Sequence, residues 1–148
     1  MSEYDVNSIE VLSPQEHIKR RKGMYIGDGT DPSHLFNEIL DNALDESSAG
    51  YSHLTEVVVD YPNNTYSVTD HGRGFPQGMI YDPVSGKDLE VVELLATTSF
   101  SGGKFSSNIY RISSGIHGLG LLVTSSLSSS LRLITWRDHS EVDYLANE

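Results

Sequence analysis

One segment, residues 34–47, carries the clearest helical pattern in this chain of 148 residues. At about 100° per residue, the apolar side chains of the segment fill one half of a helix surface. They are Leu35, Phe36, Ile39, Leu40, Ala43 and Leu44. Such a surface has to be buried against other elements, so we predict a helix that begins at Pro32 or Ser33, ends near Ser47 and forms part of the core.

The N-terminal part of the chain is predicted to form a polar arm followed by a short helix. Residues 1–12 contain few apolar side chains and form the arm. Ser13 and Glu16 flank Pro14 in a capping box, which is typical of a helix start. This helix is expected to run to about Lys22 and to be stopped by Gly23.

Strands and further helices follow the central helix. Residues 55–61 and 66–69 predict one hairpin, and residues 131–136 and 141–145 predict another. A helix is expected over residues 89–96, with Glu90 and Glu93 facing outward, and one over residues 121–127. Residues 97–114 are rich in serine and are interpreted as a lid or loop.

This order of elements predicts an α+β fold. Helices would cover one face of a mixed, mainly antiparallel sheet, which makes a two-layer α/β sandwich. A doubly wound parallel sheet fits the order less well. The length suits one domain, residues 13–148, behind the arm of residues 1–12.

Composition excludes several classes of function. The chain has 21 acidic and 10 basic residues and a formal net charge of −11, which opposes direct binding of DNA by this chain. It has no cysteine, so disulfides and thiolate chemistry are excluded. Because no apolar run approaches the length of a membrane span and no signal-peptide core is present, we expect a soluble, cytoplasmic protein.

The polar side of the central helix is a candidate site. His34, Glu38, Asn42 and Asp45 fall within an arc of roughly 80°. A solvated face is the ordinary explanation, but Asn and Asp cost roughly 0.5 kcal/mol or more relative to Ala in a helix. Glu38 is placed to deprotonate a water, and the amide oxygen of Asn42 suits Mg²⁺. His34 either orients Glu38 or faces solvent.

A second cluster, residues 70–76, stands at the end of a predicted strand. It reads Asp-His-Gly-Arg-Gly-Phe-Pro. One interpretation is a glycine turn with surface charges. The other is that Asp70 accepts a hydrogen bond from the exocyclic amine of adenine, because the carbonyl of guanine would repel a carboxylate.

A third cluster, residues 115–120, opens into an apolar helix and reads Gly-Ile-His-Gly-Leu-Gly. Glycines there serve either packing or the approach of a phosphate to free backbone N–H groups. The pattern matches neither the dinucleotide fingerprint nor a P-loop. Lys104 is either a solvated loop residue or a cation for phosphate.

Together these motifs resemble the ATPase subunit of bacterial-type type IIA DNA topoisomerases, the gyrase B and topoisomerase IV group of the GHKL superfamily. The resemblance covers nearly the whole chain. Its matching residues are 8–12, 23–27, 34, 38–42, 45–46, 70, 72–74, 76, 102–105 and 114–120. It implies a GHKL (Bergerat) sandwich that binds ATP and Mg²⁺ and hydrolyses ATP to power DNA strand passage.

The resemblance also implies roles for individual residues. Glu38 is the general base, His34 its helper and Asn42 the magnesium ligand. Asp70 binds the adenine amino group, directly and through water. The other residues expected at the nucleotide are Tyr4, Asp45, Arg73, Gly74, Pro76, Lys104, Tyr110, Ile112, Gly115, Ile116, His117, Gly118, Leu119 and Gly120.

Partners follow from the same resemblance. Tyr4 lies in the arm that crosses to the partner protomer, so ATP is expected to drive formation of a homodimer. A DNA-cleaving A-type subunit, DNA held by the wider topoisomerase and aminocoumarin-like inhibitors are also expected.

Two departures from the family pattern are Lys22 in place of proline and Ser114 in place of glycine. The chain also ends before the family's later strands and before the lysine-bearing second domain. The alternative is therefore a truncated, non-catalytic nucleotide-binding homologue that modulates or pairs with a full topoisomerase subunit. An oxidoreductase that depends on a dinucleotide is a distant third.

Overall fold

The computed structural model describes residues 10–27, 31–99 and 119–147. Its helices are α1 (Pro14–Arg20), α2 (Lys22–Ile26), α3 (Ser33–Ser48), α4 (Val91–Thr97) and α5 (Gly120–Leu127). Its strands are β1 (Thr55–Asp60), β2 (Thr65–Asp70), β3 (Met79–Asp82), β4 (Lys87–Glu90), β5 (Ser130–Arg137) and β6 (Ser140–Asn147). Consecutive strands pair as antiparallel hairpins, so the predicted α+β class is confirmed.

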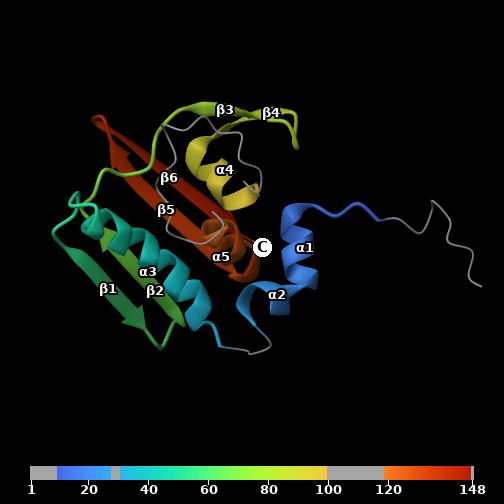
Figure 1. Ribbon diagram of the computed structural model, residues 1–148, viewed down its shortest axis with the longest axis horizontal. Helices are drawn as coiled ribbons and strands as arrows, with labels where there is room; N and C mark the ends of the chain where they lie inside the picture. The colour runs from blue at the N-terminus through green and yellow to red at the C-terminus, as the bar shows by residue number, and fades with distance from the viewer. Residues whose placement is uncertain (1–9, 28–30, 100–118, 148) are drawn as a thin grey trace, which may run out of the picture.

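The helices lie on one side of the two larger hairpins. Figure 1 shows α3 across β1–β2, with α4 and α5 in front of β5–β6. The prediction of one mixed sheet is wrong for the described residues, because the hairpins form three separate two-stranded sheets. The loop after β2 reaches β5 through a hydrogen bond to a side chain: Phe75 N donates to Thr135 Oγ1 at 2.8 Å. A backbone ladder does not form there.

Both hairpins predicted from the sequence are confirmed. In β1–β2, Thr55 pairs with Asp70 and Asp60 with Thr65. In β5–β6, Arg137 pairs with Ser140 across Asp138 and His139, whose φ angles are 50° and 67°. Two consecutive residues with positive φ form the tight turn whose twist matches that of paired strands. The turn therefore fixes the register of the hairpin.

The first predicted helix is divided in two. The capping box at Ser13 and Glu16 is present as predicted. However, α1 ends at Arg20, and Gly23 lies inside α2 instead of stopping a helix. The break falls at Arg21, whose φ and ψ of −119° and 34° are not helical.

The segment predicted as a helix over residues 89–96 begins as a strand. Leu89 and Glu90 pair with Ile80 and Met79 in the β3–β4 hairpin, and α4 begins at Val91. Glu90 and Glu93 are half-buried, so the prediction that they face outward is wrong. The sequence shows no alternation strong enough to reveal strands this short.

The core joins α1, α3 and α5. Ile18, Leu35, Leu122 and Val123 are buried together, with Tyr25, Ile26, Leu119 and Leu127 partly buried around them. On α3, Leu35 and Ala43 are buried as predicted, whereas Leu44 is 44% exposed and Glu46 is only 8% exposed. The buried side of α3 therefore includes a carboxylate.

Candidate functional site

Glu38 stands where α3 meets the start of α5. Its side chain is half-buried, and its carboxylate lies directly against Gly120, the first residue of α5. The N-terminus of a helix carries free N–H groups and partial positive charge, which favour an anion. The structure thus brings together the predicted base and one end of the predicted phosphate loop.

Asn42 follows Glu38 by one turn of α3. Its Nδ2 donates to the backbone oxygen of Glu38 at 2.8 Å. This bond uses the donor side of the amide, so the acceptor Oδ1 is the atom that suits a cation. The donor set at Asn42 therefore fits the predicted Mg²⁺ role when phosphate oxygens and water supply the remaining ligands.

Asp70 lies at the end of β2, beside the far end of α3. Its Oδ1 accepts from Gly72 N at 2.8 Å. A Cβ built on Gly72 would lie 2.7 Å from both Asp70 Oδ1 and Glu46 Oε2. The two carboxylates therefore approach the same point of the loop, and only a glycine fits between them.

Glu46 holds this loop to α3 through Arg73. Arg73 Nη2 donates to Glu46 Oε1 at 2.6 Å, and Arg73 Nε and backbone N donate to Oε2 at 3.1 and 3.0 Å. The guanidinium also lies 3.6 Å from the centre of the Tyr51 ring, which is a cation–π contact. The hydrogen bonds from Arg73 hold the pKa of Glu46 below its usual value, although burial opposes them.

Gly74 joins the same loop to β5. Its φ is 69°, and a Cβ there would overlap the backbone oxygen of Trp136 and lie 2.8 Å from Thr135 Oγ1. Arg137 Nη1 donates to Gly74 O at 3.3 Å. The loop after β2 is thus anchored to α3 on one side and to β5 on the other.

The remaining described residues of the predicted set lie around these contacts. His34 is exposed in the first turn of α3, and within the described ranges no hydrogen bond joins it to Glu38. Asp45 and Pro76 are half-buried. The other predicted residues lie outside the described part of the chain: Tyr4, Lys104, Tyr110, Ile112, Gly115, Ile116, His117 and Gly118.

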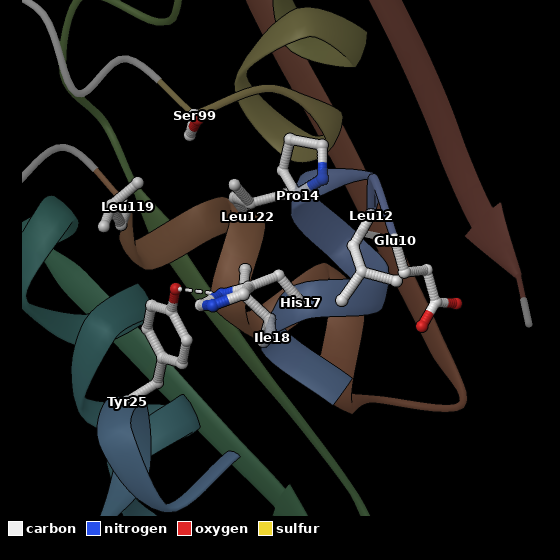
Figure 2. A pocket seen from close by; sticks show the side chains of 9 residues that line it. All are labelled: Glu10, Leu12, Pro14, His17, Ile18, Tyr25, Ser99, Leu119 and Leu122. Atoms are coloured by element: carbon white, nitrogen blue, oxygen red, sulfur yellow. Dashed lines mark hydrogen bonds between the residues drawn. The ribbon is translucent and has the colours of Figure 1, made fainter. Parts of the chain in front are cut away.

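A cavity of about 500 Å³ lies elsewhere, between α1, α2 and α5 (Figure 2). Leu12, Ile18 and Leu122 contribute to its walls, and His17 Nδ1 hydrogen-bonds to the Tyr25 hydroxyl at 3.0 Å beside it. Leu119 is the one predicted nucleotide residue among its lining residues. Glu38, Asn42 and Asp70 are not on its walls, so it is a feature separate from the polar stripe of α3.

Any cation at Asn42 would depend on ligands that the substrate brings. No group of three or more His, Asp or Glu side chains in residues 10–27, 31–99 and 119–147 is placed to hold a metal ion.

Over the same ranges, no helix has the length and apolar character needed to cross a membrane.

Sequence reasoning missed Glu46, Tyr51 and Thr135. For Glu46 a signal was present: at about 100° per residue it falls between Leu35 and Ile39, inside the apolar half of the helix. A carboxylate in that position requires a buried partner. Tyr51 and Thr135 gave no comparable signal, because their roles depend on contacts between distant parts of the chain.

Comparison of the sequence with known families places the chain in one of them. A family profile described as histidine kinase-, DNA gyrase B-, and HSP90-like ATPase matches residues 27–142. The chain belongs to this family.

The relatives that the chain resembles include subunits of DNA topoisomerases. The chain is 40% identical over 143 residues to the B subunit of DNA gyrase from Rickettsia bellii, a match that covers 95% of this chain and 17% of that protein. It is 41% identical over 140 residues to the B subunit of DNA topoisomerase 4 from Bartonella bacilliformis, covering 93% of this chain and 20% of that protein. The B subunit of DNA gyrase from Caulobacter vibrioides is 37% identical over 140 residues, again 93% of this chain and 17% of the relative. The chain therefore spans a fifth or less of the length of these relatives.

Proposed function

We propose that this chain binds ATP along the polar stripe of α3, with adenine at Asp70 and the triphosphate at the start of α5. The observation that supports this proposal best is that two different groups of polar residues lie at separate positions along α3. Asp70, with Glu46 and Arg73, lies at one of them, and Glu38 beside Gly120 lies at the other. Glu38 and Glu46 are eight residues apart, about 12 Å along a helix axis, a separation that a nucleoside triphosphate spans.

The orientation of the nucleotide follows from charge. A triphosphate is an anion and favours the N-terminus of α5, where Gly120 allows close approach. The exocyclic amine of adenine is a donor and favours the carboxylate of Asp70. The reverse orientation would place the amine of adenine, a donor, against the free N–H groups of the α5 N-terminus, which are also donors.

Hydrolysis would use Glu38 as base. Its carboxylate accepts a proton from a water whose oxygen bonds to the terminal phosphorus. The bond from that phosphorus to the bridging oxygen breaks, and ADP leaves with the electron pair. Asn42 would hold Mg²⁺ through its Oδ1, and the ion would neutralise part of the phosphate charge.

The finer assignment is that hydrolysis powers DNA strand passage by a type IIA topoisomerase. The relatives named above support this, as they are gyrase and topoisomerase 4 subunits. We propose that ATP drives dimerisation through the arm that contains Tyr4. DNA and an A-type subunit would bind to other parts of the topoisomerase. Sedimentation with and without a non-hydrolysable ATP analogue tests the dimer: a monomer at all analogue concentrations would contradict this assignment.

Calorimetric titration with the same analogue, with and without Mg²⁺, tests the binding site. Asp70→Ala is expected to abolish binding. Asp88→Ala, which removes an exposed carboxylate of β4, is the matched control and should bind the analogue as the wild type does. GTP should bind more weakly than ATP to the wild type. Wild-type protein that binds no analogue, or Asp70→Ala that binds normally, would refute the assignment.

A second measurement tests Glu38. Glu38→Ala should retain analogue binding and lose ATP hydrolysis, because it removes the base and leaves Asp70 and the loop intact. Equal hydrolysis rates in the variant and the wild type would exclude Glu38 as the base.

A further inference from the structure

Gly120 makes room for the carboxylate of Glu38. A Cβ built on Gly120 would overlap Glu38 Oε2 and would lie 3.3 Å from both Cβ and Cδ of the same side chain. All three nearest atoms belong to Glu38. The first residue of α5 and the predicted base are therefore in direct contact.

The backbone of Gly120 does not itself require glycine. Gly120 is helical, and its φ lies outside the left-handed region that glycine alone adopts readily. Alanine is the better helix former of the two. The space occupied by Glu38 is therefore a steric reason for glycine at this position.

We propose that Gly120 is a positioning residue that holds the Glu38 carboxylate at the N-terminus of α5, in the place from which it deprotonates the attacking water. This inference rests on the proposed function and adds a second role to the last glycine of the loop. Its backbone N–H remains available to a phosphate, and its missing side chain sets the position of the base.

Near the C-terminal end of α3, a second glycine leaves room for a carboxylate in the same way. A Cβ on Gly72 would lie 2.8 Å from the Cβ of Glu46 and 2.7 Å from its Oε2. At two positions along α3, Glu38 and Glu46, a carboxylate thus packs against a glycine of a neighbouring segment.

An alanine at position 120 is expected to move the base without unfolding the protein. The overlapping atom is the end of a flexible side chain, so Glu38 can rotate away at little cost. Misplacement of a catalytic group by about 1 Å costs about 100-fold in rate. Gly120→Ala should therefore lower ATP turnover by about 100-fold, well beyond any weakening of analogue binding, with a melting temperature close to that of the wild type.

A rescue variant separates positioning from a general structural effect. Glu38→Asp withdraws the carboxylate by one methylene and leaves space for a methyl group at position 120. Adding Gly120→Ala to Glu38→Asp should then lower turnover far less than it does in the wild type. Ser125→Ala, on the same helix, is the control and should leave turnover unchanged, since Ser125 Oγ has no hydrogen-bond partner among the described residues.

The experiment compares the full chain in five forms: wild type, Gly120→Ala, Glu38→Asp, the double variant and Ser125→Ala. Turnover, analogue affinity and crystal structures are measured for each. The inference would be overturned if Gly120→Ala lowered turnover by the same factor in the wild type and in Glu38→Asp. It would also be overturned if the Glu38 carboxylate had not moved in the Gly120→Ala structure. Absence of analogue binding by wild type would refute the proposed function instead, and the position of Glu38 in the Gly120→Ala structure would still decide whether Gly120 sets it.

Discussion

Arg73 donates three hydrogen bonds to Glu46, two from its guanidinium and one from its backbone N–H, at 2.6 to 3.1 Å. The two residues are 27 positions apart in sequence. Glu46 belongs to α3, and Arg73 belongs to the loop that carries Asp70 and Gly72. This pair is therefore the connection that fixes the proposed adenine end of the site to the helix that carries the proposed base.

We expect Glu46→Gln to destabilise the protein. The amide replaces a charged acceptor by a neutral one and places its NH₂ group among the donors of Arg73. Loss of charge-assisted hydrogen bonds costs about 1.5–3 kcal/mol in the free energy of unfolding, to be measured by urea denaturation at pH 7. Glu56→Gln, which removes an exposed carboxylate 3.2 Å from His71 Nε2, is the control and should cost no more than about 1 kcal/mol. Similar costs for the two variants would contradict the role given to Glu46.

The same pair predicts a dependence of stability on pH. The hydrogen bonds from Arg73 lower the pKa of Glu46 in the folded protein. A lowered pKa means that the unfolded chain binds the proton more readily, so this contribution is complete above the unfolded pKa and is lost as pH falls through the folded pKa. The stability difference between wild type and Glu46→Gln should therefore be largest near neutral pH and should shrink below about pH 4.5. Urea denaturation curves from pH 7 to pH 3 measure it, and a constant difference over that range would contradict the assignment.

Substitution of Gly74 tests whether the loop after β2 packs against β5, and a control glycine separates this contact from the effect of a positive φ. Gly74→Ala should be strongly destabilising, because the chain there has positive φ and the new methyl group would overlap Trp136 O. Gly50→Ala is the matched control: its φ is 79°, but no atom lies within 4 Å of the added Cβ. The control should lose about 1–2 kcal/mol for the left-handed backbone alone, and Gly74→Ala should lose clearly more. Equal melting temperatures for the two variants would show that the loop does not pack against β5 as described.

The capping box offers a test at the other end of the molecule. Ser13 Oγ accepts from Glu16 N at 3.2 Å, and Glu16 Oε2 accepts from Ser13 N at 2.8 Å. Ser13→Ala should lower the free energy of unfolding by about 0.5–2 kcal/mol, because α1 carries the buried core residue Ile18. Ser13→Thr keeps a capping hydroxyl and should change stability much less. If alanine and threonine gave the same thermal stability, the cap would not contribute as proposed.

Much of the secondary structure was predictable because its causes are local. Ser13 and Glu16 mark the start of α1, and the turns around Asn64 and Asp138 close the predicted hairpins. The errors arose where local signals are weak. The break at Arg21 has no glycine or proline of its own, and the four-residue strands β3 and β4 are stabilised mainly by pairing with each other.

The candidate site was predictable in part. The spacing of Glu38 and Asn42 placed both on one side of α3, and the end of β2 was correctly placed at Asp70. Contacts across the fold were not predictable from spacing. The approach of Gly120 to Glu38 and the anchoring of Phe75 by Thr135 join residues 82 and 60 positions apart, and such distances are set by packing.

The sequence by itself determined the start of α1, the helix α3, the hairpins β1–β2 and β5–β6, and which side chains are acidic, amide or glycine, because periodicity, capping and turn formation depend on near neighbours. Only the tertiary structure decided which carboxylates meet which glycines. Burial of one side of α3 against α5 and the loop after β2 forces Glu46 onto Arg73 and Glu38 onto Gly120. Close packing of elements that are distant in sequence has no signature in any single segment.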